Sequence, residues 1–306
     1  MSVLVVGSFM TDLVARTKIT PIPGQTVVGE SFGSFLGGKG ANQAIASKRV
    51  GAKTFMVGAL GDDNFGKVFL DFFVKSGFEA NHIVLKKEKS SGVGHIVIDD
   101  DSGQNQIIII PGANLEFNLD DLTKFKNLFN EATIVVNQLE MDDSIIFGSK
   151  NLAKSNQKYY LLNPAPYKDL PDEFLEGIDF LTPNETELAA FVGKKQLTTL
   201  EEIESAAKRL VKKGVVNVIV TLGENGALHC DEKGCKLYPA YQVENVVDTV
   251  AAGDAFNGTL AAMISKGESI SKAIKYANAS GALTVQRKGA IPSIPTLAEI
   301  ESFLNK

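Results

Sequence analysis

The chain has 306 residues, 44% of them hydrophobic and 22% charged, which is typical of a globular protein and excludes a disordered one. Its formal net charge is −5 and its pI is near 5.4, which argues against a nucleic-acid-binding surface. No stretch reaches the roughly 18 apolar residues that a membrane span needs. Residues 1–12 lead directly into an apolar run without a basic leader, so we expect a cytoplasmic protein.

Strand-like apolar runs alternate with helical patterns along most of the chain. The runs lie at residues 3–7, 54–60, 133–138, 159–164, 179–184 and 217–223, with helical patterns such as 63–77 and 200–214 between them. Nearly continuous apolar runs are typical of parallel strands that are covered on both faces. We therefore predict an α/β fold, a three-layer α/β/α sandwich with a mostly parallel central sheet, in a single domain over residues 1–306.

Two segments interrupt this alternation. Residues 13–35 and 92–112 show alternating polarity and Gly/Pro turns without a helical pattern, which favours antiparallel β structure. Within the second segment, "DDDSGQN" at 99–105 predicts a hairpin turn. We expect both segments to form a small sheet outside the main layers, serving either as a lid over a site or as a subunit interface.

The two cysteines, Cys230 and Cys235, flank a hairpin-like turn at residues 231–234. We interpret them as a thiol pair in a reducing cytoplasm. A disulfide, or a metal site that includes His229, is the alternative.

The stretch "DTVAAGDAFNG" at 248–258 places small residues and a carboxylate where a helical pattern begins. Unpaired N–H groups at a helix N-terminus attract anions, and small residues let an anion approach them. This favours a cradle made by the backbone of Ala251, Ala252 and Gly253, with Asp254 accepting the proton of an attacking hydroxyl during phosphoryl transfer. The alternative is that Asp254 only caps the helix.

The stretch "GGKGAN" contains Gly37, Gly38 and Gly40 just before another helical pattern. It is neither a Walker A loop nor a G-x-G-x-x-G fingerprint, which argues against a nucleotide-binding dehydrogenase. Three glycines in four residues favour a ligand loop in which Lys39 and Asn42 donate hydrogen bonds. A plain turn into a helix is the alternative.

Polar residues also follow several of the predicted strands, where the ligand crevice of such sheets lies. Asn184 and Glu187 are three residues apart, which suits a hydrated Mg²⁺ but also fits a capping box. Glu140 lies at the end of another strand, and residues 221–226 form a Gly-rich turn that could pass beneath a nucleotide.

Taken in order, "GGKGANQA", "NQLE", "LNPAP", "TPNETE", "TLGENGA", "DTVAAGDAFNG" and "RKGAIPS" resemble the ribokinase-like family of carbohydrate kinases, which also holds adenosine kinase and fructokinase. The match runs along the whole chain, and "GGKGANQA" leans toward the ribokinases. The resemblance implies ATP-dependent phosphorylation of D-ribose at its 5-hydroxyl. It implies that Asp254 is the catalytic base and that the backbone of residues 251–253 is the anion hole.

The resemblance also implies ligand contacts, two cations and a homodimer formed through the small sheet. The implied sugar contacts are Met10, Thr11, Asp12, Gly38, Lys39, Gly40, Ala41, Asn42, Glu140 and Asp254. The implied ATP contacts are Asn184, Thr221, Leu222, Gly223, Glu224, Asn225, Gly226, Gly253, Asp254 and Asn278. Glu187 would act on Mg²⁺ through water, and an activating K⁺ would lie at Asp248, Val250, Thr284, Arg287, Gly289 and Ser293, mostly against main-chain carbonyls.

Three residues depart from the family's pattern. Met10 stands where ribokinases usually have an asparagine, and a thioether cannot replace the amide's hydrogen bonds. Losing a hydrogen bond to a sugar hydroxyl can cost about 1–3 kcal/mol, so ribose affinity or selectivity would change. Val250 replaces a usual Thr, and Ala251 replaces a commoner Gly, which is tolerable as long as φ is negative. The alternatives are therefore a kinase for deoxyribose, fructose or adenosine, or a sugar-binding regulator without catalysis.

Overall fold

The computed structural model describes residues 1–102 and 104–305. Across these residues a nine-stranded sheet runs in the order β13-β12-β11-β10-β9-β8-β1-β4-β5. Its strands are Ser2–Val6 (β1), Lys53–Gly61 (β4), Ile83–Lys86 (β5), Ile134–Gln138 (β8), Tyr159–Asn163 (β9), Phe180–Leu181 (β10), Asn217–Thr221 (β11), Ala227–Asp231 (β12) and Gly234–Tyr238 (β13). Pairing is parallel from β5 to β11, and β12 and β13 add an antiparallel edge.

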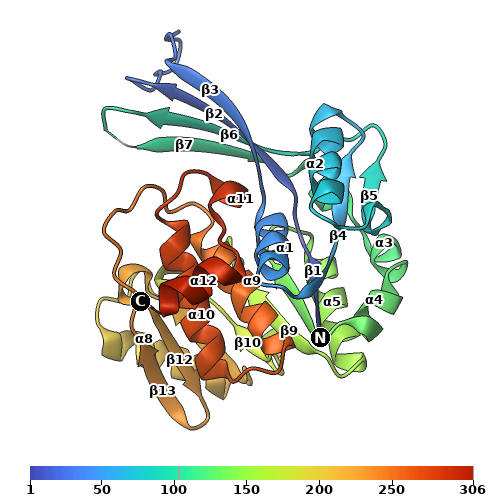
Figure 1. The fold of residues 1–306 in the computed structure, drawn as a ribbon, viewed down its shortest axis with the longest axis vertical. Helices are drawn as coiled ribbons and strands as arrows, with labels where there is room; N and C mark the ends of the chain where they lie inside the picture. The colour runs from blue at the N-terminus through green and yellow to red at the C-terminus, as the bar shows by residue number, and fades with distance from the viewer. Residues whose placement is uncertain (103, 306) are drawn as a thin grey trace.

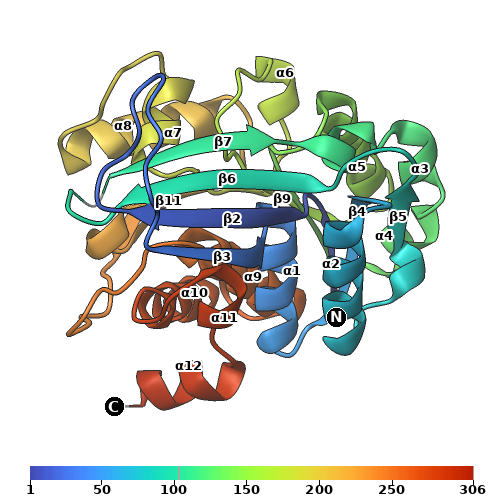
Figure 2. The same ribbon diagram turned by 90° about the horizontal axis from the view of Figure 1, so that it is seen from above.

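Helices cover both faces of this sheet (Figure 2). One layer holds Lys39–Arg49 (α1), Asn64–Lys75 (α2), Ala252–Ser265 (α9), Ile270–Thr284 (α10), Ala290–Ser293 (α11) and Leu297–Leu304 (α12). The other holds Leu119–Thr123 (α3), Lys126–Glu131 (α4), Asp143–Ser155 (α5), Asp172–Leu175 (α6), Glu185–Phe191 (α7) and Leu200–Lys212 (α8). The predicted three-layer α/β/α sandwich is confirmed.

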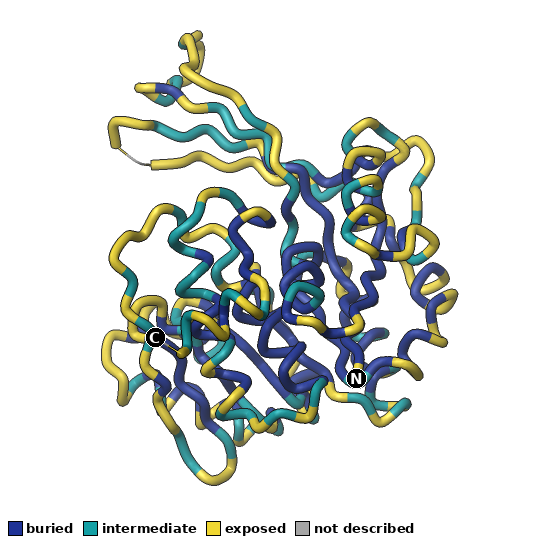
Figure 3. Tube along the Cα trace, in the orientation of Figure 1, coloured by how far each residue is buried: buried dark blue, intermediate teal, exposed yellow. Residues whose placement is uncertain are grey.

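The sheet separates two hydrophobic cores. The segments that build them are mostly buried along the trace, whereas the small sheet is largely exposed or half-buried (Figure 3). In β1 the side chains of Val3 and Val5 enter one core and those of Leu4 and Val6 enter the other, all fully buried. Because successive side chains of a strand point to opposite faces, such a strand must be apolar throughout. This is the physical basis of the continuous apolar runs in the sequence.

Helix α8 shows how the sequence places the outer layers. Its N-cap Thr199 accepts a hydrogen bond from the backbone N–H of Glu202, as expected of a capping hydroxyl. Ile203, Ala206, Ala207 and Leu210 are buried, and this i, i+3, i+4, i+7 spacing makes one apolar face. The charged residues of α8 lie on the opposite side, toward solvent.

A second, four-stranded sheet stands away from the sandwich (Figure 1). It has the order β3-β2-β6-β7 and comprises Met10–Thr17 (β2), Ser31–Gly37 (β3), Gly92–Asp99 (β6) and Asn105–Ile110 (β7). The hairpins β2–β3 and β6–β7 are antiparallel, as predicted, but β2 pairs with β6 in parallel. The parallel pairing arises because β2 follows β1 and β6 follows β5, and β1 and β5 run in the same direction. Gly103, in the predicted turn, lies outside the described residues.

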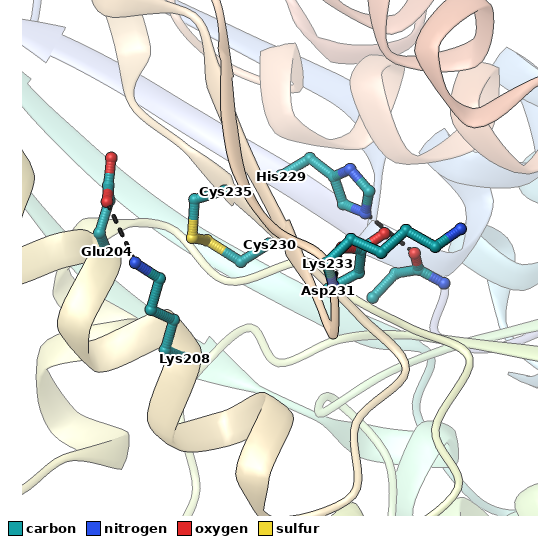
Figure 4. The surroundings of a disulfide bond; sticks show 8 residues. Glu204, Lys208, His229, Cys230, Asp231, Lys233 and Cys235 are labelled. Atoms are coloured by element: carbon teal, nitrogen blue, oxygen red, sulfur yellow. Dashed lines mark hydrogen bonds and ion pairs between the residues drawn. A yellow bond between two sulfur atoms is a disulfide. The ribbon is translucent and has the colours of Figure 1, made fainter.

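Cys230 and Cys235 form a disulfide in this structure (Figure 4), so the expectation of a thiol pair is wrong. The two residues are directly opposite each other in the β12–β13 ladder, with a Cα–Cα distance of 4.1 Å. The predicted hairpin between them is confirmed. The His229 side chain contacts Asn217 instead of the sulfurs.

Within the described residues, none of the helices is both long and apolar enough to cross a membrane.

Candidate active site

Asp254 lies in the first turn of α9 and is 8% exposed. Its carboxylate accepts two hydrogen bonds from α1: Asn42 Nδ2 donates to Oδ2 at 2.9 Å, and Gln43 Nε2 donates to Oδ1 at 3.0 Å. The N-cap of α9 is Ala251, without a side-chain cap. The capping role considered for Asp254 is therefore not what the structure shows, and the carboxylate faces the neighbouring helix.

Ala251 adopts a left-handed backbone conformation, with φ of 63°. The condition under which an alanine would be tolerated here without strain, a negative φ, is therefore not met. The left-handed region costs an L-residue with a Cβ roughly 1–2 kcal/mol, so the turn into α9 carries backbone strain that glycine would relieve. The left-handed conformation turns the chain sharply into α9, so that the amides of the first helical turn follow directly.

The backbone at the start of α9 has N–H groups that are free to bind a ligand. Among the described residues, none accepts a hydrogen bond from the N–H groups of Gly253 and Asp254, whereas Ala252 N–H donates to Thr249 O at 3.3 Å. A Cβ built on Gly253 would meet no atom within 4 Å. Free amides, a helix dipole and open space together suit an anion.

Asp12 of β2 and Glu140 after β8 lie close enough to repel each other. Burial, and secondarily the charge of Glu140, raises the pKa of Asp12 from 3.8 to about 6. Glu140 Oε2 accepts a hydrogen bond from Lys39 N–H at 3.0 Å and another from the hydroxyl of Ser8. An ionised carboxylate only accepts hydrogen bonds, so this pair suits a ligand that carries hydroxyl groups.

Lys39, the first residue of α1, lies among three carboxylates. Burial alone would lower its pKa, but the charges of Asp254, Glu140 and Glu187 raise the pKa above its ordinary value. The ammonium group is therefore firmly charged beside these three carboxylates.

The glycines of "GGKGAN" allow α1 to pack closely against the chain that follows β1. A Cβ on Gly38, which has a φ of 91°, would lie 2.7 Å from Met10 N, and one on Gly40 would lie 2.4 Å from Ser8 N. Ala41 N–H donates to Ser8 O at 3.0 Å. The glycines thus serve the turn into the helix and also bring Lys39 and Asn42 beside Asp254.

Met10 is 6% exposed, and Asn114 Nδ2 approaches its sulfur at 3.4 Å. The amide of Asn114 is buried and also bonds Phe9 N and Phe9 O. The neighbouring Thr11 hydroxyl is buried and has no partner among the described residues. The start of β2 therefore presents a thioether between polar groups.

Asn184 and Glu187 form the capping box of α7: Glu187 N–H donates to Asn184 Oδ1 at 2.7 Å, and Asn184 N–H donates to Glu187 Oε2 at 2.9 Å. Burial, and less strongly the charge of Asp254, raises the pKa of Glu187, while the Asn184 amide and Lys39 oppose this. The cap alternative is confirmed, but one carboxylate oxygen of Glu187 remains outside the box and near Asp254.

Most of the residues predicted to bind the nucleotide follow strands β10 and β11. Asn184 forms an isolated parallel bridge with Thr221, and Gly223–Asn225 is a single 3-10 turn. Gly226 has a φ of 99°, and a Cβ there would lie 2.1 Å from Tyr238 O. Leu222 is buried, whereas Glu224 is exposed. Asn278 of α10 donates to the carbonyls of Tyr238 and Pro239, so its amide holds the segment after β13.

Asp248 links three of the predicted K⁺ positions. Its Oδ1 accepts from Val250 N and its Oδ2 accepts from Gly289 N, both at 3.0 Å. The other side chains are engaged elsewhere: Thr284 Oγ1 donates to Ser280 O, Ser293 Oγ donates to Ala290 O, and Arg287 pairs with Glu299. Main-chain carbonyls remain the available cation ligands, and the described residues contain no cluster of three His, Cys, Asp or Glu side chains for a metal.

Sequence reasoning missed several residues that hold this site together, namely Ser8, Gln43, Asn114 and Asn163. Gln43 follows Asn42 inside a motif that was recognised, yet a buried glutamine in a helix carries no signal of its contacts. Asn163 ends β9, and its position at the end of a strand is the only sign in the sequence that it belongs to the site.

The whole chain matches known kinases. The model of the pfkB family carbohydrate kinases matches residues 1–297. A ribokinase of Schizosaccharomyces pombe is 35% identical over 99% of this chain and 98% of its own, and a deoxyribokinase of Salmonella typhi is 34% identical over 100% and 99%. The structure of Arabidopsis thaliana ribokinase complexed with ribose and ATP superposes with a TM-score of 0.92 at 30% identity, covering 100% and 99% of the two chains.

The chain therefore belongs to the pfkB family of carbohydrate kinases. It is a phosphotransferase with an alcohol group as acceptor, and its fold is that of the ribokinases.

Proposed function

We propose that this kinase transfers the γ-phosphate of ATP to the 5-hydroxyl of D-ribose, giving D-ribose 5-phosphate and ADP. One observation carries the proposal: a buried carboxylate, Asp254, is held by two amides of α1 directly beside the free N–H groups of the α9 N-terminus. A base next to an anion-binding backbone is the arrangement that phosphoryl transfer to an alcohol requires.

In the proposed reaction, Asp254 accepts the proton of the 5-hydroxyl while that oxygen forms its bond to the γ-phosphorus and the bond to the ADP oxygen breaks. The amides at the start of α9 stabilise the negative charge on the equatorial oxygens. Asp12, Glu140 and the free Oδ1 of Asn42, which is buried without a partner among the described residues, accept hydrogen bonds from the sugar hydroxyls. Lys39 supplies a positive charge between sugar and phosphate.

Mg²⁺ fits the acidic edge of this site. Glu187 has one carboxylate oxygen outside its capping box, and a water-mediated contact suits this ion. Mg²⁺ would neutralise phosphate charge when it is bound with ATP. K⁺ would bind main-chain carbonyls of the loops that Asp248 links and would fix the turn into α9, so exchanging K⁺ for Na⁺ should lower the rate.

A second candidate substrate, 2-deoxy-D-ribose, is favoured by Met10. The thioether is only a weak hydrogen-bond acceptor and has no donor. A sugar that lacks one hydroxyl would place no unpaired polar group beside the thioether. The similarity to a deoxyribokinase at 34% identity agrees with this candidate.

A coupled ADP-release assay over D-ribose, 2-deoxy-D-ribose, fructose and adenosine tests the proposal. D-ribose should give the highest kcat/KM. Highest activity with deoxyribose would move the assignment to the second candidate, and best activity with fructose or adenosine would overturn both. Absence of turnover with every acceptor, together with sugar binding, would identify a non-catalytic regulator.

We further propose that the small sheet, within residues 13–35 and 92–112, is the lid of a single-domain enzyme, and that two copies associate through it in the cytoplasm. All four isoleucines of β7 are exposed, and a long apolar edge strand of this kind is commonly covered by a partner.

A further inference from the structure

Gln43 is fully buried and uses its whole amide in hydrogen bonds. Its Nε2 donates to Asp254 Oδ1 and to Asn163 Oδ1, both at 3.0 Å, and its Oε1 accepts from Gln138 Nε2 at 2.7 Å. The Gln43 amide thus lies between the base and two residues at strand ends.

The orientation of this amide is determined by its partners. An ionised carboxylate can only accept hydrogen bonds. Asn163 donates through its own Nδ2 to Thr182 O at 3.1 Å, so its Oδ1 is the acceptor that faces Gln43. Both partners therefore require the nitrogen of Gln43 on their side.

We propose that Gln43 is a positioning residue for the transfer step, locking the Asp254 carboxylate in the orientation that accepts the sugar proton. The terminal torsion of an aspartate is soft and roughly two-fold. Two donors from consecutive residues, Asn42 and Gln43, each hold one oxygen and so fix this rotation. Each oxygen keeps a second lone pair for the substrate.

The support of Gln43 comes from the sheet. Gln138 ends β8 and Asn163 ends β9, so two adjacent strands of the central sheet set the position of a side chain on α1. A base must be held within about 0.5 Å of its productive geometry, and rigid strands provide this better than loops.

The positioning role rests on the proposed function, and the 306-residue chain is used to test it. Gln43→Met keeps an unbranched side chain but removes the donor, and it should lower kcat by ~10²-fold with the KM of the sugar and of ATP nearly unchanged, because misplacement of a reacting group by about 1 Å costs that much. The matched control is Ser47→Ala. Ser47 is equally buried and also joins α1 to α9, donating to Gly258 O at 2.9 Å, but it does not touch Asp254, so its kcat should stay at the parent value.

A second variant, Gln43→Glu, supplies a readout that a merely structural role would not produce. When protonated, the introduced carboxyl can donate to Asp254, and when ionised it repels it. The ratio of kcat in the Gln43→Glu variant to kcat in the Gln43→Met variant should rise at least about tenfold from pH 8.5 to pH 5.5. Lys39, Glu140, Glu187 and Asp12 also face the site, but they are common to both variants and cancel in the ratio.

The outcomes separate the two proposals. A flat ratio, or a Gln43→Met variant with the kcat of the parent, would overturn the positioning role while leaving the kinase assignment intact. Should Gln43→Met fail to fold, the Gln43→Glu profile compared directly with the parent decides the question. If the parent phosphorylates no pentose, the proposed function fails, and the positioning role fails with it.

Discussion

The fold changes the charge state of the Asp12 carboxyl near neutral pH. Its pKa is raised to about 6, first by burial and then by Glu140. The folded chain therefore binds a proton at this group between pH 3.8 and 6, where the unfolded chain has lost it. The contribution of Asp12 to the free energy of unfolding therefore falls as the pH rises from 3.8 to 6, and it stays low at higher pH.

We predict that Asp12→Asn raises the melting temperature at pH 7.5, because the variant carries no charge to desolvate. The advantage should shrink as the pH falls from 6 toward 4, and sugar affinity should drop at pH 7.5. Thermal unfolding of parent and variant across this pH range measures the effect. The same difference in melting temperature at every pH would contradict it.

At the level of single residues, the sequence predicts the charged residues of the site better than the residues that hold them in place. Asp254 and Lys39 were predicted from small residues beside a charged one, and the structure brings them into one site. Gln43, Gln138 and Asn163 could not be predicted, because their hydrogen bonds join segments more than 90 residues apart. Ala251 shows the same limit: its methyl group gives no sign that the backbone there is left-handed.

At the level of elements, helix α7 begins with a capping carboxylate for which we also propose a contact with Mg²⁺ through water. Glu187 completes the capping box with Asn184, and glutamine also serves at this position. We predict that Glu187→Gln keeps the melting temperature near that of the parent but raises the Mg²⁺ concentration needed for half-maximal rate, because the charge near the metal is lost.

The matched control for the cap is Asn184→Ala, which should cost about 1 kcal/mol of stability. Magnesium titrations of the rate and thermal unfolding of both variants measure the two effects separately. A Glu187→Gln variant with an unchanged Mg²⁺ requirement would leave Glu187 as a cap alone.

Individual strands and helices were predictable because each has a periodic pattern of its own. The continuous apolar runs of β1, β4 and β8 predicted buried parallel strands, and this is confirmed. The parallel β2–β6 pairing was not predicted, because it depends on the positions of β1 and β5 in the sheet. Likewise, the cysteine hairpin was predicted, but its disulfide was not.

At the level of the whole molecule, we propose that two copies associate through the small sheet. Ile107, Ile108, Ile109 and Ile110 are 52, 62, 57 and 48% exposed, and alternation along β7 places them on both faces of the sheet. We predict that the parent is a dimer and that Ile108→Lys combined with Ile109→Lys makes it a monomer. Sedimentation velocity measures this.

The control for that experiment is Leu237→Lys on β13, an exposed apolar residue on the far edge strand of the central sheet. It should leave the dimer intact. A parent that is already a monomer at micromolar concentration would contradict the proposed interface.

Asp254 as the proton acceptor is the centre of the proposed mechanism, and Asp254→Asn tests this role most directly. The amide keeps the shape of the side chain but cannot take a proton. We predict that kcat for D-ribose falls by about 10²–10⁴-fold, while the ribose dissociation constant, measured by calorimetry, stays close to that of the parent. A variant that turns over at the parental rate would contradict the account.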